Sequence, residues 1–315
     1  MAKKDIKIGL IGTGMIGMSN AAMFTGNGYE TRVLAVNEDF IKSGEASYDS
    51  IYENLKGRGL VSEAQAAVCK SLLSFTLDYA DLADCTVFFE SAFEKLEVKT
   101  EIYKSIEENC PNCRAIASTS SAISPDDLVS GIDKYDDRVV VAHPFAPPHV
   151  IPFVEMVRGQ KTTQEAVDLV KEVLESCGRN VCIMEKAAPG FIANRLQHAL
   201  LREAFYMVDQ GMCSARDIDK ALMYSLMPRY TSIGLFEHQD AAGLDLVCNI
   251  ETYLNQYLCS EPDCPAFVKR AVEEGHLGQK TGQGVYKWDE ASIADFKERS
   301  MAPFWKYFNW DLPEA

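Results

Sequence analysis

The sequence lacks any long hydrophobic run. Although 47% of its 315 residues are hydrophobic, no apolar segment approaches the roughly eighteen residues that span a bilayer. The opening residues, MAKKDIKIGL, also lack the longer apolar stretch and the small-residue cleavage site of a signal peptide. We therefore expect a cytoplasmic protein with no membrane partner.

Basic charge is scarce as well. The chain has 31 lysines and arginines against 46 aspartates and glutamates, which gives a net charge of −15. Such a field repels nucleic acid, and no basic stripe is present to overcome it locally. We expect no nucleic-acid partner. A small anionic cofactor is still possible, because a helix N-terminus binds phosphate without a cationic side chain.

Cysteine spacing shows no metal-binding pattern. The ten cysteines are irregularly placed, and the tightest pair is Cys110-Pro-Asn-Cys113. A zinc site would need a second pair, for which Cys259 and Cys264 are the only candidates, and neither pair has the spacing of a zinc finger. We predict no metal and free thiols in a reducing compartment.

Strands and helices are expected to alternate over the first part of the chain. The apolar run IKIGLIG (6–12) predicts a buried strand, residues 15–27 a helix, and the β-branched run 31–37 a second strand. Further helices are expected at 40–56, 62–73, 96–109 and 163–177, and further strands at 84–92, 114–120, 138–144, 153–158 and 180–186. This alternation predicts an α/β, Rossmann-like, doubly wound sheet over residues 1–186.

The strand pattern stops after residue 186. Helical spacing of apolar residues predicts helices at 191–210, 214–226 and 241–259. The sequence therefore predicts a second, all-α domain over residues 187–315.

Three glycines follow the first strand in the pattern Gly12-x-Gly14-x-x-Gly17. In a strand–turn–helix setting they predict a dinucleotide site: Gly12 for the tight turn, Gly14 for close approach of the pyrophosphate, and Gly17 for helix–sheet packing. Met15 and Ile16 complete this turn. A glycine-rich turn that binds nothing is the alternative.

The residue at the end of the second strand is Asn37, where a dinucleotide fold usually has an acid for the ribose hydroxyls. Asn37 can accept a hydrogen bond but lacks the charge that rejects a 2′-phosphate. Because Glu38 and Asp39 follow, and no arginine does, we predict NAD as the cofactor in preference to NADP.

Polar residues stand at the expected ends of other strands. Ser120 and His143 each end a strand, and Glu155 lies within an apolar strand twelve residues after His143. A carboxylate there needs a partner, and a histidine oriented by a carboxylate is a general base. A purely structural pair is the alternative. His149, in a proline-rich loop, is expected at the surface.

Six segments together resemble the 3-hydroxyacyl-CoA dehydrogenase family, and they extend over nearly the whole chain. They are GLIGTGMIG, FFESAFEKLEVK, STSS, VVAHPFAPPHVIPFVEMV, APGFIANRL and GQKTGQGVYKW. The resemblance implies a Rossmann-like NAD domain, a helical C-terminal domain that makes a homodimer, and an active site between the two domains.

The resemblance also implies roles for individual residues. His143 matches the general base and Glu155 its orienting carboxylate. Ser120 and Asn194 match the residues that hydrogen-bond the reacting oxygen, and Glu94 matches a glutamate near the nicotinamide. The implied reaction interconverts a 3-hydroxy and a 3-oxo group with NAD.

Two segments depart from the enzymes that act on acyl-CoA. The chain has HPFAPP where those enzymes have HFFNP, and MPRYTSIG where they have YPMGP. Both changes resemble a branch that acts on free 3-hydroxy acids, namely L-gulonate 3-dehydrogenase with lambda-crystallin, and carnitine dehydrogenase; Ala146 departs from both groups. Arg229 suits a free carboxylate, which a guanidinium binds through two hydrogen bonds.

Two alternatives stay open. The segments LKGRGLVSEAQ and GQKTGQGVYKW resemble bacterial 3-hydroxybutyryl-CoA dehydrogenases, and Lys56 and Arg58 could bind the phosphates of an acyl-CoA. Arg229 would then be a surface or interface residue. The lambda-crystallin resemblance also suggests, as an alternative, a structural protein that has lost its catalytic activity. The presence of all four catalytic candidates counts against this alternative.

Overall fold

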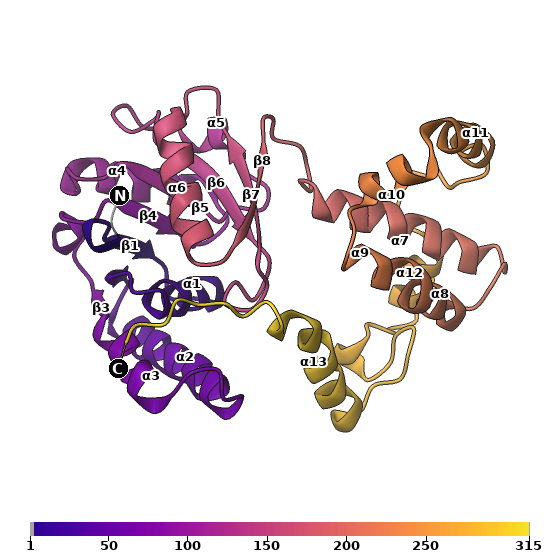
Figure 1. Cartoon of the computed structure of the whole chain (residues 1–315), viewed down its shortest axis with the longest axis horizontal. Coiled ribbons are helices and arrows are strands. Elements are labelled where there is room, and N and C mark those ends of the chain that lie inside the picture. The colour runs from indigo at the N-terminus through magenta and orange to yellow at the C-terminus, as the bar shows by residue number, and fades with distance from the viewer. Residues whose placement is uncertain (1–2, 315) are drawn as a thin grey trace. The chain divides into compact units, whose positions relative to one another are not determined.

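A computed structural model describes residues 3–314. The chain forms two compact units: the first runs to Phe191 and takes in the residues from Ser300 onward, and the second is Ile192–Arg299. The C-terminal residues therefore differ from the predicted division, which placed them in the helical domain. They return to the first unit (Figure 1) because Trp310 is buried in its core.

The first unit is built on one eight-stranded sheet with the order β3-β2-β1-β4-β5-β6-β7-β8. Its strands are β1 (Ile8–Ile11), β2 (Thr31–Leu34), β3 (Leu73–Thr76), β4 (Val87–Glu90), β5 (Ala115–Ser118), β6 (Val139–Pro144), β7 (Phe153–Arg158) and β8 (Asn180–Met184). All neighbours pair in parallel except β6 and β7, which are antiparallel. The Rossmann-like prediction is confirmed.

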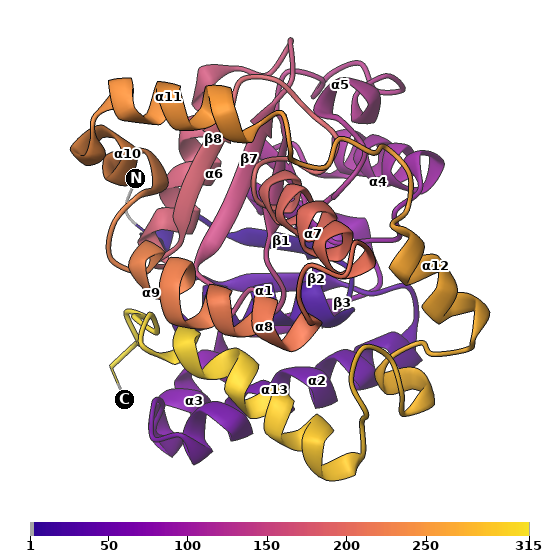
Figure 2. The same ribbon diagram turned by 90° about the vertical axis from the view of Figure 1, so that its right-hand side faces the viewer.

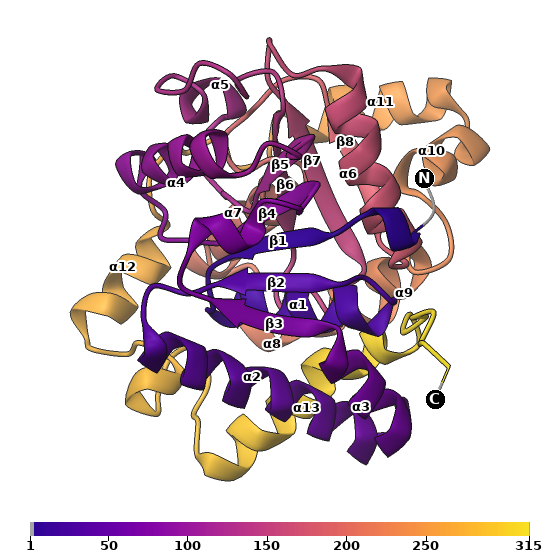
Figure 3. The ribbon, with the colours of Figure 1, turned by 90° about the vertical axis from the view of Figure 1, so that its left-hand side faces the viewer.

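Helices cover both faces of this sheet (Figure 3). They are α1 (Met15–Gly26), α2 (Glu38–Gly57), α3 (Glu63–Ser71), α4 (Leu96–Asn109), α5 (Pro125–Leu128) and α6 (Gln164–Ser176), with short 3₁₀ turns η1 (Lys3–Asp5) and η2 (Tyr79–Leu82). Apolar side chains of α1, α2, α3 and α6 form the core on one face, and those of α4 and α5 form it on the other. Burial of apolar area on both faces is the main stabilising contribution.

Strand β3 was not predicted. The expected helix at 62–73 ends at Ser71, and Leu73–Thr76 immediately forms the edge strand beside β2. The start of this helix is as expected, because Ser62 and Gln65 form a capping box. No glycine, proline or other turn residue separates helix from strand here, so no local signal marks the end of the helix.

The second unit is helical, as predicted, and is best followed in Figure 2. It holds α7 (Ala193–Asp209), α8 (Ala215–Ala221), the π turn η3 (Leu222–Leu226), α9 (Met227–Tyr230), α10 (Leu235–Ala242), α11 (Leu244–Leu254), α12 (Ala266–Glu273), the 3₁₀ turn η4 (Gln279–Thr281) and most of α13 (Glu290–Trp305). The predicted helix at 241–259 is present only over Leu244–Leu254, so its predicted ends are wrong. Gly243 has a φ of 98°, which breaks the helix between α10 and α11. No helix within residues 3–314 is long and apolar enough to cross a membrane.

Candidate active site

The predicted site residues of the first unit gather at one edge of the sheet. Strands β1, β2, β4, β5 and β6 run parallel, so their carboxyl ends lie at the same edge. The glycine turn follows β1, Asn37 follows β2, Glu94 follows β4, Ser120 follows β5, and His143 lies near the end of β6. Ligands of open α/β sheets bind at this edge.

The glycine turn has the geometry of a phosphate site. Gly12 has a φ of 108°, and a Cβ there would lie 2.8 Å from the backbone oxygen of Ser91. A Cβ on Gly17 would lie 2.2 Å from the Gly12 oxygen, whereas a Cβ on Gly14 would meet nothing within 4 Å. Two glycines are thus needed for packing, and the third faces open space.

This open space suits the pyrophosphate of a dinucleotide. Gly14 is the N-cap of α1 and supplies no side-chain cap, and the first turn, which includes Met15 and Ile16, has no acidic residue. The first N–H groups of a helix have no partner within it and attract anions. The Ser91 hydroxyl oxygen is also buried and has no hydrogen-bond partner among residues 3–314. These residues fit NAD.

Asn37 has a structural role that the sequence analysis did not anticipate. Its Oδ1 accepts hydrogen bonds from the N–H groups of Asp39 and Phe40, at 3.0 and 3.1 Å, and so caps α2. Its side-chain oxygen is therefore occupied, and its NH₂ group is the part that could donate to a ribose.

His143 and Glu155 face each other across the antiparallel pair β6 and β7, as directly opposed residues. The Nδ1 of His143 lies 3.1 Å from Oε2 of Glu155. The Glu155 side chain is fully buried and that of His143 is 14% exposed. Since a carboxylate accepts, Nδ1 carries the proton and Nε2 is the basic nitrogen. This is the geometry of an oriented base.

Ser120 and Glu94 form a second contact at the same edge. The Ser120 hydroxyl donates to Oε1 of Glu94 at 2.5 Å, and the N–H groups of Ser121 and Ala122 donate to the same oxygen at 3.0 and 3.2 Å. Burial alone would raise the pKa of Glu94. The Ser120 hydrogen bond and the charge of Lys99 outweigh burial and lower it.

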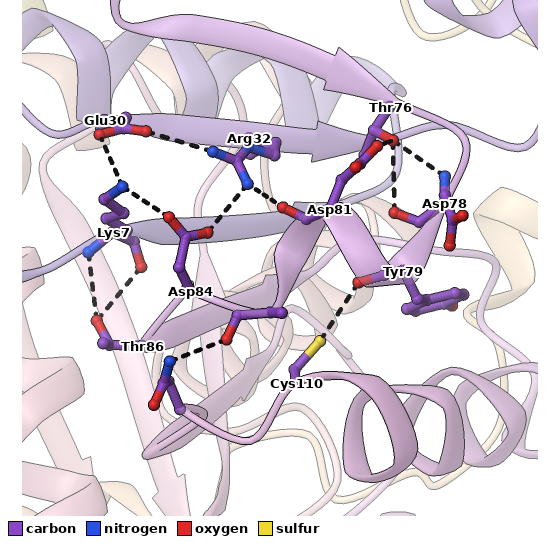
Figure 4. A network of polar contacts seen from close by, with 12 residues as sticks. Lys7, Glu30, Arg32, Thr76, Asp78, Tyr79, Asp81, Asp84, Thr86 and Cys110 are labelled. Atoms are coloured by element: carbon purple, nitrogen blue, oxygen red, sulfur yellow. Dashed lines mark hydrogen bonds and ion pairs between the residues drawn. The ribbon is translucent and has the colours of Figure 1, made fainter.

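A second polar network lies near the amino-terminal ends of β1, β2 and β4 (Figure 4). Lys7 lies 2.6 Å from Asp84 and 3.4 Å from Glu30, and Arg32 lies 3.0 Å from Asp84. The hydrogen bond between Lys7 and Asp84 raises the pKa of the lysine and lowers that of the aspartate. Lys7, Glu30 and Asp84 precede their strands, and Arg32 is the second residue of β2. All four side chains are at least partly exposed, so we assign them a minor structural role.

Two predicted site residues belong to the helical unit. Asn194 lies in the first turn of α7 and is partly exposed. Arg229 in α9 donates from Nη1 to Nε2 of His238 in α10, at 2.9 Å. Because a guanidinium only donates, His238 accepts and is neutral at that nitrogen. No carboxylate within residues 3–314 forms an ion pair with Arg229.

The expectation that His149 is a surface residue is wrong. The ring is partly buried, and its Nδ1 lies 2.9 Å from the Ser19 hydroxyl of α1. Burial, together with the charge of Arg179, lowers its pKa to about 4. The prolines suggested an exposed loop, and no local pattern showed that this loop lies on α1.

The sheet and the glycine turn define an NAD-binding oxidoreductase of the Rossmann type. Comparison with known proteins makes this more specific. Residues 7–187 match the NAD-binding domain of 3-hydroxyacyl-CoA dehydrogenases, and residues 190–288 match their C-terminal domain. The chain belongs to the 3-hydroxyacyl-CoA dehydrogenase family, whose members are NAD-dependent dehydrogenases acting on a hydroxyl group.

Relatives within this family differ in substrate. An L-carnitine dehydrogenase of Oceanobacillus iheyensis is 32% identical over 75% of this chain and 76% of its own. A 3-hydroxybutyryl-CoA dehydrogenase of Bradyrhizobium diazoefficiens is 30% identical over 91% of this chain and 97% of its own. The solved structure of 5-formyl-3-hydroxy-2-methylpyridine 4-carboxylic acid 5-dehydrogenase, an NAD⁺-dependent dismutase, has a TM-score of 0.82 at 25% identity and covers 95% of this chain and 96% of its own.

Proposed function

We propose that this protein oxidises, or forms in reverse, a small polar free 3-hydroxy acid of the L-gulonate or carnitine type. The family membership already gives an NAD-dependent dehydrogenase acting on a hydroxyl group. The choice of a free acid over an acyl-CoA is the new part of the proposal.

Each site residue has a chemical role in this reaction. Nε2 of His143 removes the proton of the 3-hydroxyl, and Glu155 stabilises the imidazolium that forms. Ser120 and Asn194 hydrogen-bond the oxygen as it becomes a carbonyl. Bound NAD supplies the acceptor for the C3 hydride. The turn with Gly14 holds the cofactor at the head of α1.

The choice of a free acid rests on the contacts that Lys56 and Arg58 already make within the protein. Lys56 lies 2.7 Å from Glu53 and 2.6 Å from Glu63. Arg58 hydrogen-bonds Asn54, and its guanidinium carbon lies 4.2 Å from the centroid of the Trp305 ring. Both cations considered for the phosphates of an acyl-CoA are therefore held by other residues of the protein.

Arg229 supports the same choice. His238 holds one of its nitrogens at 2.9 Å, which restricts the guanidinium while leaving further donors for a ligand. A free carboxylate accepts two such hydrogen bonds, whereas a thioester carries no charge at that position. The names of two relatives, an L-carnitine dehydrogenase and a pyridine carboxylic acid dehydrogenase, agree with a carboxylate-bearing substrate.

The test is turnover of L-gulonate, L-carnitine and (S)-3-hydroxybutyryl-CoA, followed by NADH absorbance. We expect one of the free acids to react. Arg229→Met should raise its KM about 10- to 100-fold, the loss expected for a charge-assisted pair. The matched control is Arg216→Met, which removes an exposed arginine of α8. Turnover of the thioester alone would overturn the free-acid proposal.

His143→Gln tests the base separately. It should lower kcat by at least about 10²-fold while NAD affinity stays nearly unchanged. An unchanged rate would rule out His143 as the base.

We also infer a cytoplasmic homodimer formed through the helical unit. No residue of helices α7 to α12 is fully buried in the described chain, and large apolar side chains such as Phe236, Leu244 and Tyr253 are 63–85% exposed. Exposed apolar surface of this extent is typical of an interface. The ten free cysteines suit a reducing compartment.

A further inference from the structure

The hydrogen-bonding capacity of Ser120 is already used within the protein. Its hydroxyl donates to Glu94 at 2.5 Å, and its oxygen accepts from the N–H groups of Ala122 and Ile123 at 3.3 and 2.8 Å. A hydroxyl has one proton and two lone pairs. Ser120 can therefore donate to a substrate oxygen only if its proton turns away from Glu94.

Glu94 would then lose its only side-chain hydrogen-bond donor within residues 3–314, although the N–H groups of Ser121 and Ala122 remain. Lys99 of α4 provides another side-chain partner, because its Nζ lies 3.4 Å from Oε2 of Glu94, the oxygen that Ser120 does not use. The Lys99 side chain is 1% exposed. A lysine is almost never buried to this extent unless its charge is paired.

Lys99 is itself fixed by a second carboxylate. Its Nζ lies 2.7 and 2.9 Å from the two oxygens of Glu90, whose side chain is fully buried. Glu90 also accepts from Tyr103, Ser118 and the N–H of Ala92, at 2.9, 2.8 and 2.7 Å. With every partner satisfied, this ammonium has one defined position.

The register of the sheet explains why these groups meet. Glu90 ends β4 and pairs directly with Ser118, which ends β5. Glu94 and Ser120 follow these two strands, while Lys99 and Tyr103 are one turn apart on α4. The two neighbouring strand ends thus bring the buried pair to the catalytic edge.

We propose that Lys99, held by Glu90, is a positioning residue that fixes the place and negative charge of Glu94, so that the Ser120 hydroxyl can turn its hydrogen bond from Glu94 to the reacting oxygen. Only rotation of the hydroxyl about its Cβ–Oγ bond is required. Glu94 keeps Lys99 and the two backbone N–H groups when the proton turns. This inference rests on the proposed dehydrogenase reaction.

The test uses a variant in which the buried pair is neutral. Lys99→Met alone would leave Glu90 charged and unpaired in the core, which is strongly destabilising. Lys99→Met with Glu90→Gln removes both charges and keeps one acceptor oxygen, which can serve Tyr103 and Ser118. Lys104→Met is the matched control, because it removes an exposed lysine of the same helix, 3.0 Å from Glu101.

Two measurements are made on each full-length protein. The protonation of Glu94 is followed by infrared difference spectroscopy against the same protein carrying Glu94→Gln, which needs no substrate. The charged or titratable groups that interact with Glu94 are Lys99 and Tyr103. The second measurement is kcat and KM against pH, with melting temperature and NAD affinity recorded in parallel.

In the double variant we expect Glu94 to protonate about one pH unit higher than in the wild type, equivalent to a tenfold change in its proton affinity. We also expect kcat to fall about tenfold, with NAD affinity within about twofold of the wild type. This loss of kcat should disappear when both proteins carry Glu94→Gln, because the effect runs through Glu94.

A Glu94 titration that coincides with that of the wild type would overturn the inference, as would a loss of kcat that persists in the Glu94→Gln background. If the wild-type protein turns over neither a free acid nor a thioester, the proposed function fails. The infrared titration would still decide whether Lys99 controls Glu94.

Discussion

A hydrogen bond at one ring nitrogen of a histidine fixes which nitrogen carries the proton and which one can accept. In this protein the antiparallel register of β6 and β7 places Glu155 directly opposite His143. The 3.1 Å contact at Nδ1 leaves Nε2 available. One buried carboxylate therefore decides which nitrogen can accept a proton, without any further residue being required.

His149 leads to a prediction about stability against pH. Its pKa falls from the ordinary 6.5 to about 4 in the folded protein, because of burial and the nearby Arg179. Below pH 6.5 the unfolded chain binds a proton that the folded chain refuses. The free energy of unfolding should therefore fall as the pH falls from 6.5 to 4, by up to about 3 kcal/mol in total.

Urea unfolding at a series of pH values would measure this loss, with His149→Gln as the comparison. Glutamine keeps a polar group for Ser19 but does not titrate, so its curve should be flatter between pH 6.5 and 4. Parallel curves for the two proteins would contradict the assignment. Above pH 7 the histidine is neutral in both states and contributes no pH dependence.

Two glycines at the start of helix α1 have different roles, and single substitutions can separate them. Gly17→Ala would force a Cβ to within 2.2 Å of the Gly12 oxygen. The backbone would have to move, and we expect a loss of about 3 kcal/mol in the free energy of unfolding. NAD affinity should fall with it.

Gly14→Ala is the matched change, because its Cβ would meet nothing within 4 Å and its φ of −70° suits any residue. We expect the free energy of unfolding to change by less than about 1 kcal/mol, while NAD affinity falls at least about tenfold as the methyl meets the pyrophosphate. Calorimetric titration with NAD and urea unfolding test both variants. Equal NAD affinity in Gly14→Ala and the wild type would contradict the proposed phosphate position.

At the scale of the whole molecule, the C-terminal residues complete the first unit (Figure 1). The Trp310 ring is 7% exposed and lies against Gly26, where a Cβ would come within 2.3 Å of it. The N–H of Asp311 donates to Asn27 at 2.9 Å. The end of α1 is therefore closed by residues almost three hundred positions further along the chain.

Replacing this ring should destabilise the first unit. We expect Trp310→Ala to lower its free energy of unfolding by about 3 kcal/mol. Trp310→Phe should lower it by clearly less, because the Nε1 of Trp310 has no hydrogen-bond partner to lose. Chemical unfolding followed by circular dichroism measures both. Equal stability of the alanine variant and the wild type would show that the segment does not support the fold.

Much of the architecture could be predicted because it depends on local patterns. Periodicity placed α4 at Leu96–Asn109 and β7 at Phe153–Arg158, and Ser62 with Gln65 marked the start of α3. Edge strand β3 was missed because four residues of mixed polarity carry little signal. The break at Gly243 was missed because a lone glycine is tolerated in many helices.

Local sequence patterns predicted the Rossmann-like sheet, the glycine turn and NAD as the cofactor, and they indicated the candidate site residues. The packing of separate elements was needed to place other side chains: His149 lies on α1, and Lys99 lies between Glu90 and Glu94. The two kinds of contact differ in how far apart the interacting residues are in the sequence. Periodicity and capping depend on residues a few positions apart, whereas the contacts of His149 and Lys99 depend on how separate elements pack together.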